Sequence, residues 1–110
     1  MINTSNANWL DEFKELVKTH NFDCLFDALG GGEISDQIFA HMPPNSKNHV
    51  YGALTGSKLS ISPTNLLSGL KVEGFLLFTW WGPTSQEVKD EIKKDYSKYL
   101  KNELLTVTYK

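Results

Sequence analysis

Apolar residues along the chain fall into three short runs, separated by stretches in which they recur every three or four positions. The runs cover residues 22–29, 49–53 and 72–81. Apolar runs of this length between glycines are typical of strands buried on both faces, which occur mostly in parallel sheets covered by helices. We therefore predict a strand at each run, with the first and third buried on both faces.

The stretches before, between and after the runs have helical spacing. It predicts helices in residues 9–19, 33–42, 63–70 and 85–101. Asn8 is the expected N-cap of the first helix, and Thr84 with Glu87 matches a capping box before the last. Short strands are also expected at Ile2 and in residues 105–109.

Helices thus alternate with strands along the chain. The stable arrangement for this order is a mostly parallel sheet with right-handed crossovers and helices on its faces, so the predicted fold class is α/β. A chain of 110 residues with no internal repeat or low-complexity linker predicts a single domain.

The composition bears on whether the protein binds nucleic acid or membrane. A net charge of -2 with 22% charged residues gives no basic patch for nucleic acid, and no apolar stretch approaches the ~20 residues that span a bilayer. We therefore expect neither nucleic acid nor membrane as a partner. The chain has one cysteine and no recognisable leader, which predicts an intracellular protein of the cytoplasm or the mitochondrion.

The first candidate site is the glycine cluster after the first run. Gly30, Gly31 and Gly32 follow the expected carboxyl end of a strand, where open α/β sheets bind ligands. A plain tight turn explains them equally well, because the full G-x-G-x-x-G fingerprint is absent. Asp23 and Asp27 lie four apart on one strand face and can be read as an acid–base pair, but the pattern favours strand-end or capping carboxylates.

The other reactive or aromatic residues have structural interpretations. Cys24 lies inside the first run, where we expect a buried, inert thiol. The three histidines are isolated in the sequence, and each is interpreted as structural. Trp80 and Trp81 can stack on a ring-shaped ligand, but an aromatic pair at a strand end favours an interface.

Three motifs, taken in order, carry a resemblance to a known family. They are NFDCLFDALGG at residues 21–31, HVYGALTG at residues 49–56 and LKVEGFLL at residues 70–77. They resemble the second half of the nucleotide-binding domain of medium-chain dehydrogenases, and are most similar to the quinone oxidoreductase and enoyl thioester reductase branch. The resemblance implies a Rossmann-like sheet, with residues 1–110 forming a partial nucleotide-binding domain. The family's catalytic domain, glycine-rich phosphate loop and alcohol dehydrogenase zinc ligands have no counterpart here.

The resemblance also implies a function. The parent enzyme would be an NAD(P)H-dependent oxidoreductase that transfers a hydride from NADPH or NADH to a quinone, enoyl or carbonyl substrate. The implied cofactor-binding residues follow the strands and are Ala28, Leu29, Gly30, Tyr51, Gly52, Ala53, Leu54, Gly74, Phe75, Leu76 and Leu77. The resemblance supplies no catalytic residue and no metal ligand in this chain. We therefore expect the chain alone to be inactive and to bind nucleotide weakly or not at all.

A second hypothesis is a non-catalytic interaction or dimerisation module, such as a subunit of a larger assembly. The run at residues 72–81 would present unpaired backbone and exposed aromatic side chains at the end of a small sheet, with only Glu73 to protect it. In the family, the corresponding strand pairs antiparallel with its twin across a two-fold axis. The resemblance therefore implies a homodimer through residues 72–81.

Overall fold

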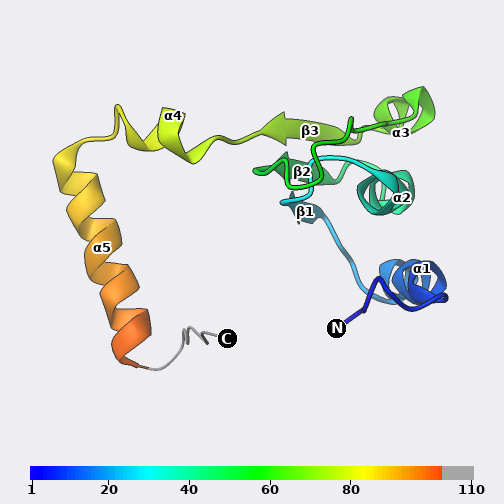
Figure 1. Ribbon diagram of the computed structural model, residues 1–110, viewed down its shortest axis with the longest axis horizontal. Helices are drawn as coiled ribbons and strands as arrows, with labels where there is room; N and C mark the ends of the chain where they lie inside the picture. The colour runs from blue at the N-terminus through cyan, green and yellow to red at the C-terminus, as the bar shows by residue number, and fades with distance from the viewer. Residues whose placement is uncertain (103–110) are drawn as a thin grey trace. The chain divides into compact units, whose positions relative to one another are not determined.

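The computed structural model describes residues 1–102, which form two compact units divided after Leu76. The first unit contains α1 (Trp9–Thr19), β1 (Cys24–Asp27), α2 (Glu33–His41), β2 (Lys47–Val50), α3 (Pro63–Leu67) and β3 (Lys71–Gly74) (Figure 1). The second contains α4 (Leu77–Trp81) and α5 (Gln86–Lys101). The expected strand at residues 105–109 lies outside the described residues. The expected strand at Ile2 is wrong, because residues 1–3 are not in a strand.

The three strands form one parallel sheet in the order β1-β2-β3. Phe26 of β1 is opposite His49 of β2, which is opposite Glu73 of β3. Side chains of directly paired residues point to the same face of a sheet, so these three share one face. The parallel sheet with flanking helices confirms the predicted α/β fold class.

The core lies on the other face of the sheet. Its fully or nearly buried members come from α2, the residue after it and the residue before β3: Phe39, Met42 and Leu70. Residues of the three strands and of α1 pack against them, namely Leu25, Val50, Val72 and Phe13. The helices α1, α2 and α3 lie together on one side of the strands (Figure 1). The first unit is therefore a two-layer arrangement with a small core.

The prediction that the first run is buried on both faces is wrong. Cys24 is exposed, and Phe26 keeps 70% of its surface accessible. The helices of the first unit pack on the core face only, so the alternate residues of β1 point away from any cover in that unit. Cys24 is therefore not the buried thiol that the sequence predicted.

The strands are shorter than their apolar runs. β1 begins at Cys24 rather than residue 22, and β2 begins at Lys47, two residues before the predicted run. β2 ends at Val50, so Tyr51 and Ala53 lie in the loop that follows it. These shifts move predicted strand residues into the loops at the sheet edge.

The third run changes from strand to helix partway along. Residues 71–74 form β3, and Leu77–Trp81 form α4, so the prediction of one strand through residue 81 is wrong. Val50, the last residue of β2, pairs with Gly74, the last residue of β3. A short apolar run cannot be assigned to strand or helix by periodicity alone.

The N-cap of α5 is one residue later than predicted. Ser85 is the N-cap, and its side chain accepts a hydrogen bond from the Val88 N–H. Thr84 instead donates to the carbonyl of Trp80, the last turn of α4, at 2.5 Å. The Thr84 capping box is therefore wrong, although the helix itself was predicted within a residue or two.

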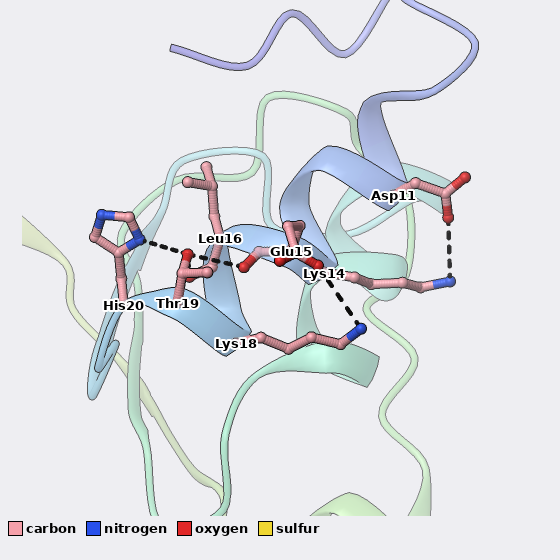
Figure 2. Close-up of polar contacts among 7 residues, drawn as sticks. All are labelled: Asp11, Lys14, Glu15, Leu16, Lys18, Thr19 and His20. Carbon is pink, nitrogen blue, oxygen red and sulfur yellow. Dashed lines mark hydrogen bonds and ion pairs between the residues drawn. The ribbon is translucent and has the colours of Figure 1, made fainter.

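Local polar contacts define the ends of α1. Asn8 occupies the N-cap position as expected, but its side chain donates to Glu12 Oε1 at 2.8 Å instead of capping the backbone. At the other end, Thr19 Oγ1 donates to the Glu15 carbonyl at 2.9 Å and lies 2.9 Å from His20 Nδ1 (Figure 2). Such contacts at an exposed helix end fix its conformation locally and add little to stability.

Candidate functional site

The candidate site lies where the carboxyl ends of the three strands meet. Because the strands are parallel, residues 28–30, 51–54 and 74–76 all lie at the same end of the sheet, where the strands finish. This end of the sheet is called the carboxyl edge. The sheet ladder continues into these segments. The Tyr51 N–H donates to the Asp27 carbonyl at 2.9 Å, and the Phe75 N–H donates to the Val50 carbonyl at 2.8 Å. The structure thus brings together ten of the eleven residues that the resemblance implied; Leu77 instead begins α4 in the second unit.

The turn after β1 is hydrogen-bonded to the loop after β2. The Leu54 N–H donates to the Ala28 carbonyl at 3.3 Å, and the Thr55 N–H donates to the Leu29 carbonyl at 3.2 Å. The Thr55 hydroxyl adds bonds to the Leu29 and Gly31 carbonyls. The two segments therefore form one connected surface.

Two glycines allow the backbones of these segments to approach each other. A Cβ on Gly30 would collide with the carbonyl oxygen of Gly52, and a Cβ on Gly52 would collide with the carbonyl oxygen of Ala28. Gly30 also has a φ of 70°, which side chains other than glycine rarely adopt. Both glycines are thus required by packing at this edge.

Gly74 does not have that role. A Cβ there would meet nothing within 4 Å, and its φ is not positive. The sequence placed Gly74 inside a buried strand, whereas it is the exposed last residue of β3. No close backbone approach is seen at this position.

Asp27 is an acidic residue at the end of β1, and its carboxylate is hydrogen-bonded to the turn that follows it. Its carboxylate accepts hydrogen bonds from the N–H groups of Leu29 and Gly30 and from the hydroxyl of Ser35. Asp23 is exposed and precedes β1. The geometry matches the favoured interpretation of a strand-end carboxylate for Asp27, and gives no acid–base pair.

A cavity of about 480 Å³ lies on the open face beside this edge, lined by Phe26, His49, Tyr51 and Phe75. The ring of His49 stacks on Phe26 with centroids 5.3 Å apart and planes inclined by 22°. His49 Nδ1 also lies 3.8 Å from Glu73 Oε2. The volume is within the range of small-molecule sites, and the lining is almost entirely aromatic.

Sequence reasoning found Tyr51 and Phe75 but missed Phe26 and His49. The signal for the missed pair was their place in the strands, because alternate strand residues share a face. That signal could be used only with knowledge that this face carries no helix of the first unit.

The second unit has its own aromatic cluster. Trp80 and Trp81 have ring centroids 6.1 Å apart at 46°, and Lys89 Nζ lies 5.5 Å from the Trp81 ring centroid. A hollow of about 310 Å³ is lined by Leu77, Phe78 and Trp81. Phe78 is 80% exposed. The interface interpretation of the tryptophans stays a prediction.

Two further features bear on chemistry. Within residues 1–102, no three His, Cys, Asp or Glu side chains are grouped so that they could hold a metal ion. Among the helices of the same residues, none has both the length and the apolar character to cross a membrane.

Comparison with known proteins identifies solved structures that have a similar fold. The chain matches no protein-family model and has no significant match among curated proteins. Among solved structures it is similar to a protein named as an NADPH:quinone reductase from Bacillus thuringiensis, with a TM-score of 0.82, 21% identity and 98% of this chain covered. It is also similar to one so named from Mesorhizobium loti, with a TM-score of 0.78, 23% identity and 96% covered.

This chain spans only about a third of those chains, 32% and 31% of their lengths. At such identities the likeness establishes the fold. The chain therefore shares the Rossmann-like α/β fold of the corresponding part of those two structures, which confirms the predicted fold class.

Proposed function

We propose that this chain is part of the nucleotide-binding domain of an NAD(P)H-dependent oxidoreductase. The observation that carries the proposal is the carboxyl edge of the parallel sheet, where three segments meet beside an aromatic-lined cavity. Ligands of open α/β sheets bind at this edge. The fold is shared with proteins named as NADPH:quinone reductases, which supports NADPH as the cofactor and a quinone, enoyl or carbonyl compound as hydride acceptor of the parent enzyme.

The edge suits the nicotinamide side of the cofactor. A nicotinamide ring is flat, and the aromatic side chains of Tyr51 and Phe75 line a cavity large enough for it. The ribose would contact the backbone of residues 28–30 and 52–54. Gly30 and Gly52 keep that backbone compact and free of side chains.

Binding by this chain alone should be weak. The sequence lacks the full G-x-G-x-x-G fingerprint that binds the pyrophosphate at a helix N-terminus, so we expect contacts with only one half of the nucleotide. A millimolar dissociation constant corresponds to only about 4 kcal/mol, which a few backbone and ring contacts can supply.

The test is a titration of the isotope-labelled chain with NADPH, followed by backbone amide chemical shifts. We expect shifts in residues 28–30, 51–54 and 74–76, saturating in the millimolar range. Tyr51→Ala should weaken binding about threefold to tenfold, the equivalent of one aromatic contact of ~0.5–1.5 kcal/mol. Leu66→Ala, at an exposed position of α3, is the matched control and should leave binding unchanged. Shifts that cluster elsewhere, or none at all, would contradict the proposal.

A specific observation also favours a second candidate function, dimerisation. β3 is the outer strand of the sheet, and within residues 1–102 no strand pairs with its other side. Leu76, which follows it, is 58% exposed. An antiparallel contact between two β3 strands would extend one sheet through both copies and cover both edges.

A further inference from the structure

Asp27 accepts three hydrogen bonds with its carboxylate at the carboxyl end of β1. It is the last residue of β1 and only 7% exposed. Its Oδ1 accepts from the Leu29 N–H at 2.9 Å, and its Oδ2 accepts from the Gly30 N–H at 3.2 Å and from Ser35 Oγ at 2.6 Å. Ser35 is itself buried, in the first turn of α2. The carboxylate therefore joins the strand end, the turn and the helix.

These contacts fix a segment that would otherwise be mobile in its backbone. Gly30, Gly31 and Gly32 all have positive φ, and glycine loses more conformational freedom on ordering than any other residue. The Asp27 carboxylate holds the start of this turn at two successive N–H groups. It fixes the direction in which the chain leaves the sheet.

The same turn positions the second segment of the edge. The carbonyls of Ala28 and Leu29, which lie between Asp27 and the glycines, accept the N–H groups of Leu54 and Thr55. A change in the turn would therefore displace the loop after β2 as well. One carboxylate thus determines the placement of two of the three segments at the proposed nucleotide site.

We propose that Asp27 is a positioning residue of this site. It does not touch the nucleotide, because its oxygens are buried and already accept three hydrogen bonds. It acts through the backbone of residues 28–30 and 54–55, holding them in the conformation that binds the nicotinamide side. The inference rests on the function proposed above.

The test compares NADPH affinity with stability in variants of the whole chain. Asp27→Asn keeps the shape but replaces one accepting oxygen with an amide that cannot accept, so affinity should fall about fivefold to tenfold through lost preorganisation. Ser35→Ala removes only the bond to α2 and should lower the urea midpoint while leaving affinity within about twofold. Asp23→Asn makes the same chemical change at an exposed position and should alter neither.

Amide shifts report NADPH binding at each variant. Wild-type affinity in a folded Asp27→Asn overturns the inference and leaves the proposed function standing. Affinity lost in Ser35→Ala in proportion to its stability would assign a purely structural role and also overturns it. If wild type itself shows no NADPH-induced shift, the proposed function fails and the inference fails with it.

A second variant covers the case in which Asp27→Asn does not fold. Asp27→Ser retains a hydroxyl that can accept from the turn N–H groups more weakly and carries no buried amide. A loss of affinity of about fivefold in that folded variant supports the inference. Wild-type affinity in it overturns the inference.

Discussion

At the scale of single residues, Gly52 and Gly74 differ in the space that is available to an added side chain. A Cβ at Gly52 would meet the carbonyl of Ala28, so Gly52→Val should lower the free energy of unfolding by about 1–3 kcal/mol or more. Gly74→Val adds a side chain in open space and should change it by no more than about 0.5 kcal/mol. Urea unfolding of both variants measures the difference. Equal losses would mean that β3 continues under cover beyond Gly74.

The sequence alone gives the opposite expectation for Gly74, because it places that glycine within a buried run. Only the observed last pair of the two strands, Val50 with Gly74, shows that β3 ends there. The sequence also does not predict the φ of 84° at Gly32, because a run of glycines does not reveal which of them adopts a left-handed backbone conformation. Gly32→Ala should therefore cost about 1 kcal/mol or more, between the two valine variants.

Asn48 is a buried polar residue that the sequence did not single out. It is 1% exposed, and its Nδ2 donates to the Lys71 carbonyl at 3.0 Å, joining β2 to β3. Asn48→Ala should lower the free energy of unfolding by about 0.5–1.5 kcal/mol, because the partly buried Lys71 carbonyl loses a side-chain hydrogen bond. Asn21→Ala, at an exposed position, is the control in the same urea titration. Equal stability of the two variants would contradict this role.

At the scale of elements, the neighbours Thr84 and Ser85 have different roles, because only Ser85 caps α5. Ser85→Ala should weaken the first turn of α5 by about 1 kcal/mol, because the Val88 N–H loses its acceptor. Thr84→Ala should leave that turn intact, since Thr84 bonds to the end of α4 instead. Secondary chemical shifts of residues 86–89 measure both effects. A larger loss of helicity with Thr84→Ala would restore the capping box that the sequence suggested.

The helices were easier to predict than the strands. Their apolar spacing and end signals gave α1, α2 and α5 within a residue or two, because both are local properties of the chain. Strand ends depend on a partner that lies far along the sequence. For that reason the sequence pattern predicts a third strand that includes the residues of α4, and a second strand that omits Lys47.

At the scale of the whole molecule, the outer edge of β3 predicts association of two copies. Leu76→Lys should convert the proposed homodimer to a 12.4 kDa monomer, because a two-fold contact places the new charge in the interface twice. Leu66→Lys on α3 is the control for an added charge at an exposed leucine. Sedimentation velocity at micromolar concentration distinguishes the species. A wild-type chain that is already monomeric would exclude this mode of pairing.

The alternation of strands and helices is sufficient to predict the α/β class, whereas the place of Ala28, Tyr51 and Phe75 at the carboxyl ends of the strands was implied by the family resemblance. The alternation could not predict the cavity, because Phe26 and His49 line it only where one sheet face has no helix of the first unit against it. Which face is covered depends on packing between distant segments. No pattern within a single strand carries that information.

We propose that this chain supplies the nicotinamide side of a nucleotide site and not the adenine side. The most direct measurement compares two halves of the cofactor, reduced nicotinamide mononucleotide and adenosine 2′,5′-bisphosphate, by amide chemical shifts under identical conditions. We expect millimolar binding of the nicotinamide half, with shifts in residues 28–30 and 51–54, and at least about tenfold weaker binding of the adenine half. Equal or tighter binding of the adenine half would contradict it.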